Sequence, residues 1–332
     1  MTPRGLRINL IARSNGVGLS RDLSLLYAAL KRMGHEIHCT KIRGGKLHKY
    51  LLPVLVRVRT ALRRLVARRA TRYDLNLLLE HIRPEYFPLA RYNVLLPNPE
   101  WLPPREVAML GNIDRVFAKT RHADRIFATH ACSTCCIGFT SLDRLDRRVD
   151  RQRSFFHLAG GSRCKGTARL LALWREHPEW PMLTVVQHPR RAQTRIHAAN
   201  IDHRIGYLDD AELKRLQNVH RFHLCPSETE GFGHYIVEAM SVGAVVITVD
   251  GAPMNELIQP DRGFLIAHAR SSQLNLAPVY YFDEAALATA VEHAIALTDA
   301  ELDHLGAVAR VWYETNDRLF DKHLGAAIAT LV

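Results

Sequence analysis

The sequence predicts an α/β protein built from two similar-sized halves and closed by C-terminal helices. Apolar runs of strand length alternate with segments of helical periodicity along the 332 residues. Such alternation implies parallel sheets whose faces are covered by helices. A break falls at 142–153, where charged and polar residues predominate and a linker is expected. We therefore divide the chain into halves at 1–150 and 151–310, followed by a helix at 311–332.

The first half opens with the pattern of a strand, a helix and a second strand. Residues 8–12 form an apolar run, and apolar residues then recur at helical spacing until Gly34, where the helix should end. Residues 35–39 return to a strand pattern. Gly16 and Gly18 follow the first strand, where such a loop suits a phosphate or hydroxyl of an acceptor. Ordinary turn glycines explain the same residues equally well.

Three further strands of the first half each lead into a polar or proline-rich loop. They are expected at 75–79, 94–96 and 116–118. Ligands of open α/β sheets bind at the carboxyl ends of the strands. Candidate ligand-binding residues in these loops are His81, the cluster of Asn98, Glu100 and Trp101, and more weakly Lys119 and His122. The alternative for each is a loop residue whose polar groups are satisfied within the protein.

The second half repeats the alternation and ends in helices. Strands are expected at 154–158, 183–187, 222–225 and 245–249, with helices over 167–174 and 235–242. Residues 160–166 form the loop after the first of these strands. Two closing helices are expected to begin near Asp283 and Asp299, because Asp is a good N-cap residue.

Two glutamates flank the start of the helix expected over 235–242. Seven residues separate Glu230 from Glu238, and Gly231 and Gly233 allow a ligand to approach the backbone closely. A helix N-terminus stabilises anions through its free N–H groups and its dipole, which suits a diphosphate. Ionised carboxylates accept strong hydrogen bonds, which suits sugar and ribose hydroxyls. On charge spacing alone, two acids on an ordinary surface helix are the simpler explanation.

The wider string around these glutamates resembles the donor-site signature of family 4 retaining glycosyltransferases. It reads Pro226-Ser227, then Glu230-Gly231-Phe232-Gly233, Glu238-Ala239-Met240 and Gly243-Ala244-Val245-Val246-Ile247, with Ala244 in place of the usual Pro. The segment 251–258 is similar to the family's glycine-rich turn and the glutamate that follows it. The segment 160–166 is similar to its Lys-Gly phosphate loop. The resemblance covers about 155–265.

This resemblance implies the GT-B fold, in which two Rossmann-like domains face each other across a cleft. Residues 1–150 would bind the acceptor, 151–310 would bind the nucleotide-sugar, and the helix at 311–332 would pack back on the first domain. By the same resemblance, Glu230 contacts the donor sugar, Glu238 the ribose and Lys165 the diphosphate. The other donor-binding residues that it implies are Arg163, Gly166, Ser227, Gly231, Phe232, Gly233 and His234.

The implied reaction is glycosyl transfer with retention, without a metal or other cofactor. No Asp-x-Asp occurs in the chain, so the charge of the leaving group would be met by Lys165, by Arg163 and by the amides of 231–234. The family carries an Arg where this chain has Ala159, and Arg163 is the candidate to replace it. Glu230 could act as a nucleophile, but we favour an orienting role.

On the acceptor side, His81 follows a strand at the place where related enzymes carry a histidine near the reacting sugar. Asn98, Glu100, Gly16 and Gly18 would complete this site. The expected acceptor is a glycan or a lipid-linked glycan, as in the synthesis of cell-envelope polysaccharide or lipopolysaccharide. The alternatives are a GT-B enzyme of other chemistry, such as a sugar-nucleotide epimerase, and a catalytically inactive GT-B scaffold.

A strong positive charge points to an acidic partner. The net charge is +12, and the segment from Lys41 to Tyr73 holds eleven Lys and Arg residues and no acid. Within it, 53–69 pairs an apolar stripe with an arginine-rich face, as in helices that lie on anionic membrane. A stripe that faces the protein core, with solvated arginines, is the alternative. A nucleic-acid-binding function is not expected, because no recognition module, zinc spacing or interleaved aromatic pattern is present.

Two remaining features favour a cytoplasmic protein, and the basic segment 53–69 is what suggests a peripheral position on the inner face of the cytoplasmic membrane. No apolar run reaches the roughly 18 residues needed to span a bilayer, and the first strand follows the start too closely for a signal-peptide core. Cys132 and Cys135 form a CxxC near His130, but zinc needs four ligands and no second pair has suitable spacing. We expect packed, reduced thiols there.

Overall fold

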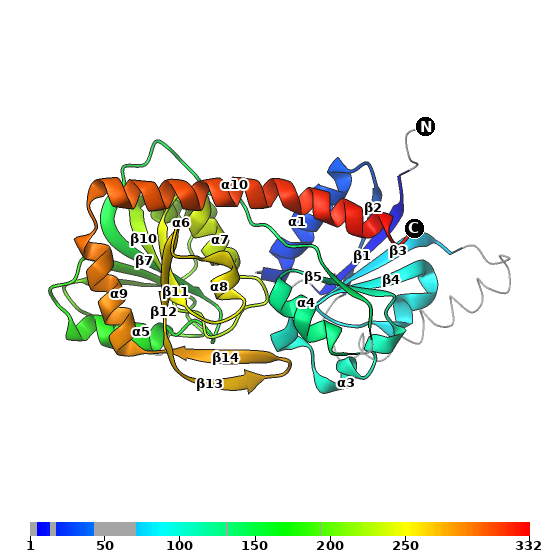
Figure 1. The fold of residues 1–332 in the computed structure, drawn as a ribbon, viewed down its shortest axis with the longest axis horizontal. Helices are drawn as coiled ribbons and strands as arrows, with labels where there is room; N and C mark the ends of the chain where they lie inside the picture. Colours follow the sequence, from blue (N-terminus) through cyan, green and yellow to red (C-terminus); the bar gives the residue numbers. More distant parts are fainter. Residues whose placement is uncertain (1–4, 14–17, 43–70, 131, 193) are drawn as a thin grey trace. The chain divides into compact units, whose positions relative to one another are not determined.

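Parallel strand pairing builds two six-stranded sheets in the computed structural model, each packed against helices (Figure 1). The structure describes residues 5–13, 18–42, 71–130, 132–192 and 194–332. The chain divides into two units. The first unit comprises Met1–Gly138 and Leu319–Val332, and the second comprises Phe139–Arg318. The charged segment 142–153 belongs to the second unit and stays irregular until β7 begins.

The sheet of the first unit has the order β2-β1-β3-β4-β5-β6, and its strand pairs are parallel. Its strands are β1 (Arg7–Arg13), β2 (Glu36–Ile42), β3 (Tyr73–Leu79), β4 (Ala90–Leu96), β5 (Arg115–Ala118) and β6 (Thr134–Cys136). Its helices are α1 (Gly18–Arg32), α3 (Pro104–Val107), α4 (Arg121–Ala128) and the short 3-10 turns η1 (Pro84–Leu89), η2 (Pro99–Trp101) and η3 (Leu110–Asn112). The strands expected in this half are confirmed. The aliphatic residues of β1, β3, β4 and β5 are buried, whereas β2 at the edge of the sheet is exposed or half-buried.

A row of side-chain amides crosses the middle of this sheet. Asn9 Nδ2 donates to Asn76 Oδ1 at 3.0 Å, and Asn76 Nδ2 donates to Asn93 Oδ1 at 2.8 Å. Thr40 Oγ1 donates to Asn9 Oδ1 at 2.8 Å, which extends the row to β2. The three asparagines are buried, and the strand register places them side by side. Buried amides of this kind are stable only when their hydrogen bonds are made.

The sheet of the second unit has the order β12-β11-β10-β7-β8-β9, again with parallel pairing. Its strands are β7 (Gln152–Gly160), β8 (Leu183–Gln187), β9 (Ile201–Ile205), β10 (His220–Cys225), β11 (Val245–Val249) and β12 (Gly263–Ile266). Its helices are α5 (Thr167–Glu176), α6 (Asp210–Val219), α7 (His234–Ser241), α8 (Met254–Leu257) and α9 (Glu284–Ala296). The chain winds outward in both directions from β7 and β10, so these neighbours flank the switch point of the sheet.

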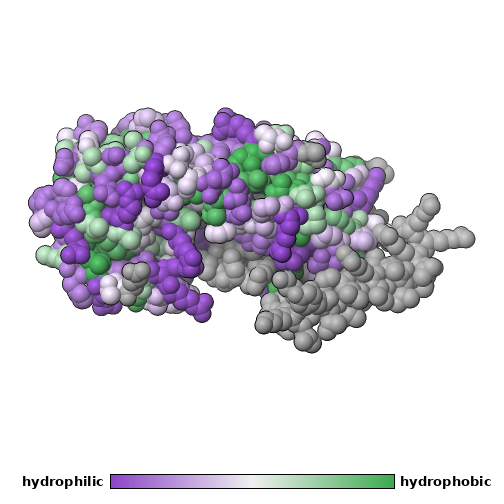
Figure 2. Space-filling view, turned by 90° about the horizontal axis from the view of Figure 1, so that it is seen from below, coloured by the Kyte–Doolittle hydropathy of each residue, from purple (hydrophilic) through white to green (hydrophobic). Residues whose placement is uncertain are grey.

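A hairpin that the sequence did not predict follows β12. Its strands β13 (His268–Leu274) and β14 (Ala277–Phe282) pair antiparallel and form a separate sheet. The residues of β13 are exposed except for the last, whereas β14 buries Ala277, Val279 and Phe282. Hydrophilic residues cover most of the second unit's face in the view from below (Figure 2). The hairpin therefore packs through one strand and presents the other to solvent.

One long helix, α10 (Asp299–Ala329), closes the chain, and its start agrees with the helix expected near Asp299. Its last turns group with the first unit. There, Arg32 makes two hydrogen bonds of 2.7 Å to the carboxylate of Asp321, and Arg115 donates to Thr330 at 2.6 Å. None of the helices formed by the described residues combines the length and apolarity required to cross a bilayer.

Candidate active site

Two loops of the second unit meet where β7 and β10 end. The loop 160–166 follows β7, and the loop 226–233 follows β10. The amide of Glu228 donates to the carbonyl of Cys164 at 3.0 Å, which joins the loops directly. Gly166 has a φ of +63°, and a Cβ there would lie 2.9 Å from the carbonyl oxygen of Pro226. Only glycine fits this crossing, which explains the Lys-Gly pair in the sequence.

The centre of this junction is an ion pair between Lys165 and Glu230. Ser227 Oγ donates to the same carboxylate oxygen of Glu230, and the Tyr235 hydroxyl lies within hydrogen-bond distance of Ser227 Oγ. Lys165 Nζ also lies 3.3 Å from the centroid of the Tyr235 ring, a cation–π contact. The side chains of Lys165 and Glu230 are 12% and 15% exposed, so a ligand can reach both groups.

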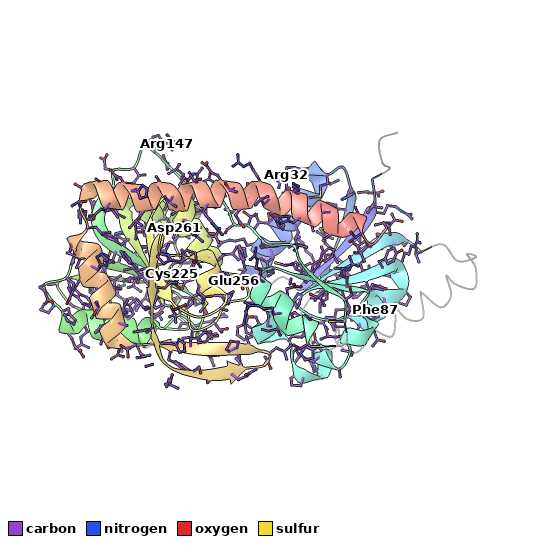
Figure 3. All side chains as sticks on the ribbon, viewed as in Figure 1. Arg32, Phe87, Arg147, Cys225, Glu256 and Asp261 are labelled. Atoms are coloured by element: carbon purple, nitrogen blue, oxygen red, sulfur yellow. The ribbon has the colours of Figure 1, made fainter. Side chains whose placement is uncertain are left out.

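Burial keeps the groups beneath this pair neutral. It raises the pKa of Tyr235 and the pKa of the Cys225 thiol well above their ordinary values. Cys225 lies inside the second unit at the end of β10 (Figure 3). Tyr235 therefore acts as a neutral hydrogen-bond donor at physiological pH, and Cys225 is not a thiolate nucleophile.

The helix that follows the second loop begins at a glycine. Gly233 is the N-cap of α7 with a φ of +105°, and it offers no side chain to the first turn. A Cβ at Gly233 would lie 3.0 Å from Leu257, so the position is crowded as well as left-handed. Amides at an N-terminus that lacks a side-chain cap are suited to an oxyanion.

Glu238 and Phe232, which the resemblance assigns to the donor site, are enclosed. Glu238 is fully buried, and its carboxylate accepts hydrogen bonds from Ser141 Oγ at 3.3 Å and Gln217 Nε2 at 2.9 Å. Ser141 Oγ also lies 3.1 Å from His234 Nδ1. Phe232 packs edge-on against Phe139, with ring centroids 5.4 Å apart. A ribose contact by Glu238 stays a prediction, and it requires that this carboxylate be uncovered.

A basic loop that was not among the predicted site residues lies beside the loop 160–166. It follows β8, the neighbour of β7, and Arg191 Nε donates to the carbonyl of Gly161 at 2.9 Å. The amide of His188 donates to the carbonyl of Gly160 at 3.0 Å. Arg163, the predicted replacement for the missing Arg, is exposed on the loop 160–166 itself. The signal for Arg191 was present, because Arg190-Arg191 directly follows an expected strand.

In the first unit, polar side chains gather at the carboxyl ends of β3, β4 and β5. His81 Nδ1 lies 3.3 Å from Glu106 Oε2, which also accepts from the amide of Ile82 at 2.8 Å. Burial alone would raise the pKa of Glu106, but hydrogen bonds from His81 and Ile82 lower it overall. Glu80, next to His81, has a φ of +67°, a strained conformation for a residue with a side chain.

A buried ion pair completes this cluster. Lys119 Nζ lies 2.5 Å from Asp22 Oδ2 of α1 and donates to Asn98 Oδ1 at 2.8 Å. The Lys119 and Asp22 side chains are 3% and 4% exposed. The structure therefore brings together His81, Asn98 and Lys119, and adds Asp22. Asp22 could not be predicted, because a single acid within a helical pattern does not distinguish a site residue from a surface residue.

The other predicted acceptor residues are placed differently. Glu100 is buried and Trp101 is 46% exposed. Gly18 begins α1, whereas Gly16 lies outside the described residues. The basic segment 53–69 also lies outside them.

The cysteines near His130 are free thiols. Cys132 Sγ contacts the carbonyl of Phe127 at 3.3 Å, and burial raises the pKa of Cys132 and of Cys135. Across the parts of the chain that the structure describes, no group of three or more His, Cys, Asp and Glu side chains is arranged to hold a metal ion.

Part of the sequence matches a known protein family. Residues 154–277 match the family described as glycosyl transferases group 1. No curated protein matches the chain in sequence. Solved structures with the same fold include a glycosyltransferase from Rickettsia africae ESF-5, at 13% identity and a TM-score of 0.71 with 96% of each chain covered.

Two other solved structures share this fold. Sucrose-phosphate synthase from Thermosynechococcus elongatus is similar at 15% identity and a TM-score of 0.71, with 98% of this chain and 99% of that chain covered. HepE from Anabaena, in complex with UDP and glucose, is similar at 14% identity and a TM-score of 0.65, with 98% and 100% covered. This chain therefore has the GT-B fold, and its residues 154–277 match the glycosyl transferases group 1 family, which supports glycosyl transfer.

Proposed function

We propose that this glycosyltransferase moves a sugar from a nucleoside-diphosphate sugar to a glycan or lipid-linked acceptor, with retention of configuration and without a metal ion. The observation that carries the proposal is the ion pair of Lys165 and Glu230 at the switch point of the second sheet. Structural neighbours solved in complex with UDP and with UDP-glucose make UDP the first nucleotide to test.

The ion pair suggests how donor binding prepares the site. A diphosphate placed at the N-terminus of α7 would compete with Glu230 for Lys165, because both are anions within reach of one ammonium group. Release from Lys165 would free the Glu230 carboxylate to accept hydrogen bonds from sugar hydroxyls. Glu230 in this role orients the sugar and forms no covalent bond.

In the transfer step, the bond between the anomeric carbon and the diphosphate oxygen breaks, and its electron pair stays on that oxygen. The acceptor hydroxyl oxygen forms the new bond, and its proton passes to the departing phosphate. Lys165, Arg191 and the first amides of α7 would stabilise the growing negative charge. Fixed donors of this kind lower the barrier by roughly 3 kcal/mol each.

The acceptor would bind to the cluster of His81, Asn98 and Lys119 in the first unit. Strained backbone at Glu80 favours a functional role for this cluster, since strain persists where binding geometry requires it. We further propose that the enzyme acts in cell-envelope polysaccharide or lipopolysaccharide synthesis, at the inner face of the cytoplasmic membrane. The basic segment 53–69 supports a membrane-bound acceptor.

The test is donor turnover by Glu230→Gln, with Glu176→Gln at an exposed position of α5 as the matched control. Purified enzyme is incubated with UDP-sugars and GDP-sugars, and release of nucleoside diphosphate is measured with and without a glycan acceptor. Glu230→Gln should lower turnover at least about 100-fold, while Glu176→Gln should match the wild type. Unchanged turnover by Glu230→Gln would refute the donor-site assignment, and an epimerised donor without transfer would indicate an epimerase.

A further inference from the structure

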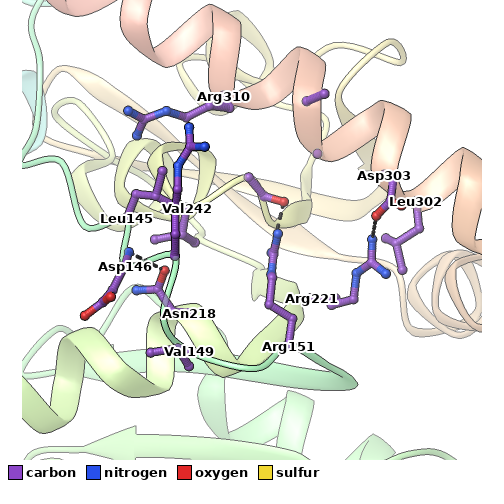
Figure 4. A pocket seen from close by; sticks show the side chains of 14 residues that line it. Leu145, Asp146, Val149, Arg151, Asn218, Arg221, Val242, Leu302, Asp303 and Arg310 are labelled. Carbon is purple, nitrogen blue, oxygen red and sulfur yellow. Dashed lines mark hydrogen bonds and ion pairs between the residues drawn. The ribbon is translucent and has the colours of Figure 1, made fainter.

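The second unit contains a cavity at the edge of its sheet opposite the Lys165–Glu230 pair (Figure 4). Its volume is about 360 Å³. The lining comes from 145–151, 218–221, 242–243 and 302–310. These segments lead into β7, β10 and β11 or belong to α10, so the cavity faces the amino ends of the strands. The donor loops follow the carboxyl ends, which makes this a separate site.

Arginine dominates the polar part of this lining. Four lining residues are positive (Arg147, Arg151, Arg221 and Arg310) and two are negative (Asp146 and Asp303), so the formal charge of the lining is +2 before the acidic partners outside it are counted. Leu145, Val149 and Val242 add apolar surface on one side of the lining, and Leu302 adds it on the other (Figure 4). The cavity therefore suits a compact anion.

Two of the arginines already have acidic partners. Arg310 donates to the carboxylate of Asp143 at 2.6 and 2.8 Å. Arg310 also donates to the carboxylate of Glu314 at 2.8 Å. Arg221 pairs with Asp303 and lies 3.7 Å from Asp299. These contacts hold the two guanidinium groups in place and partly neutralise them.

Arg151 differs, because its one hydrogen bond among the described residues is to the carbonyl of Gly243, at 3.0 Å. No described carboxylate lies within ion-pair distance of it. Arg151 is exposed to solvent overall. Desolvation by neighbouring protein atoms and the positive charge of Arg221 still lower the pKa of Arg151 to about 10, against an opposing effect of Asp303. The Arg151 guanidinium group therefore has N–H groups that can donate to a ligand and a positive charge that no carboxylate of the described residues neutralises.

Close backbone packing fixes the shape of the cavity. Gly243 has a φ of +64°, and a Cβ added at Gly306 of α10 would lie 2.5 Å from the Gly243 carbonyl oxygen. The turn that holds Arg151 is therefore pressed directly against α10. Arg147 is exposed on the segment before β7 and projects away from the sheet (Figure 3).

We propose that this cavity binds a phosphoryl group, as inorganic phosphate or as a phosphate monoester, through Arg151 and Arg221. The planar guanidinium fork matches phosphate oxygens, and the volume lies in the usual range for small-molecule sites. The ligand acts as an effector or a structural ion, since the cavity lies at the edge opposite the donor loops. The proposal does not depend on the identity of the donor.

The test compares the thermal stability of the full-length protein in inorganic phosphate and in chloride at matched ionic strength, with glycerol 3-phosphate as a second probe. Wild-type protein should be stabilised by phosphate in a saturable way. Arg151→Gln should weaken phosphate binding about tenfold or more, because a charged hydrogen bond is lost. Arg151→Lys, which keeps the charge, should retain part of the effect and shows that the position tolerates substitution.

Two controls separate this cavity from other anion sites. Arg175→Gln changes an exposed arginine of α5 and should leave the phosphate effect intact. Lys165→Gln disables the donor loops and should also leave it intact. Stabilisation that survives in Arg151→Gln, or that disappears in Lys165→Gln alone, would overturn the proposal. Binding of glycerol 3-phosphate without binding of phosphate would assign the cavity to a phosphate monoester.

Discussion

Lys165 and Glu230 form an ion pair although they lie 65 positions apart in the sequence. The parallel order of β7 and β10 brings their loops together, and Ser227 and Tyr235 hold the pair from below. Because Lys165 is the cation that would receive the diphosphate, its replacement by Met should lower kcat about 100-fold or more. Turnover of the nucleotide-sugar measures this effect, with Lys322→Met on the exposed end of α10 as the control. Equal losses in both variants would contradict a specific role for Lys165.

Tyr235 is expected to position Lys165 and Ser227 without touching the substrate. Tyr235→Phe keeps the ring beneath the ammonium group but removes the hydroxyl that meets Ser227, so we expect a loss of about 1 kcal/mol in unfolding free energy. Its kcat should fall while its KM for the donor changes little. Tyr235→Leu removes both contacts and should lower kcat further. Denaturant unfolding and steady-state kinetics test the two effects separately, and a change in KM alone would contradict the positioning role.

Arg191 is expected to bind the phosphates of the donor. It would replace the arginine that the resembled family carries at the position of Ala159. Arg191→Gln should weaken UDP binding by about tenfold and leave uridine binding unchanged, because only the charged ligand uses the guanidinium group. Arg190→Gln, one residue away and exposed, is the matched control. Calorimetric titration of both ligands measures the difference. Equal weakening of UDP and uridine would indicate a structural role for Arg191.

Three buried histidines of the second unit should make the protein acid-sensitive. Burial lowers the pKa of His157 and of His220 to about 4 and that of His223 to about 3. In the unfolded chain these groups titrate near the ordinary value, about 6.5. Between about pH 6.5 and 4 the unfolded state therefore binds more protons, and the free energy of unfolding falls as the pH falls.

Each of these histidines can contribute up to about 1.4 kcal/mol per pH unit in that window. Unfolding by urea at pH 7.5, 6 and 5 should show a progressive loss of stability. His157→Gln should reduce the slope even if it lowers stability at pH 7.5. A slope identical to that of the wild type would show that His157 is not one of the groups responsible.

The basic segment 53–69 should bind anionic membranes. Vesicles that contain an anionic lipid should recruit the protein, and added salt should release it, because each Arg near such a surface contributes about 1 kcal/mol. Replacing Arg63 and Arg64 by Gln should weaken binding measurably. Equal partitioning onto neutral and anionic vesicles would contradict the electrostatic interaction.

Much of the fold could be predicted from the sequence, because the strands of parallel sheets are buried runs of apolar residues. The donor loops could be predicted because Lys165 and Glu230 lie in sequence motifs that are specific to few protein functions. The hairpin β13–β14 was missed, since the residues of β13 are polar and Asn275 is a lone turn signal.

Residues whose role depends on distant neighbours could not be predicted. The burial of Glu238 depends on Ser141, 97 positions away, and on Gln217 of another helix. Arg191 contacts Gly161 because β7 and β8 are neighbours in the sheet. The order of strands in the sheet could not be predicted from the sequence. Tyr235 lies in the first turn of the apolar helix α7 and has the sequence signature of an ordinary core residue.

The amide row of Asn9, Asn76 and Asn93 has a consequence for how the first sheet assembles. Its strands are rich in leucine, and apolar packing alone discriminates poorly between alignments of such similar side chains. A slip by one residue would turn an asparagine to the opposite face of the sheet. The amides of the neighbouring asparagines would then be buried without hydrogen-bond partners, at a cost of about 1–3 kcal/mol for each unsatisfied group. The row thus favours the native register over slipped ones, because only that alignment satisfies all three buried amides.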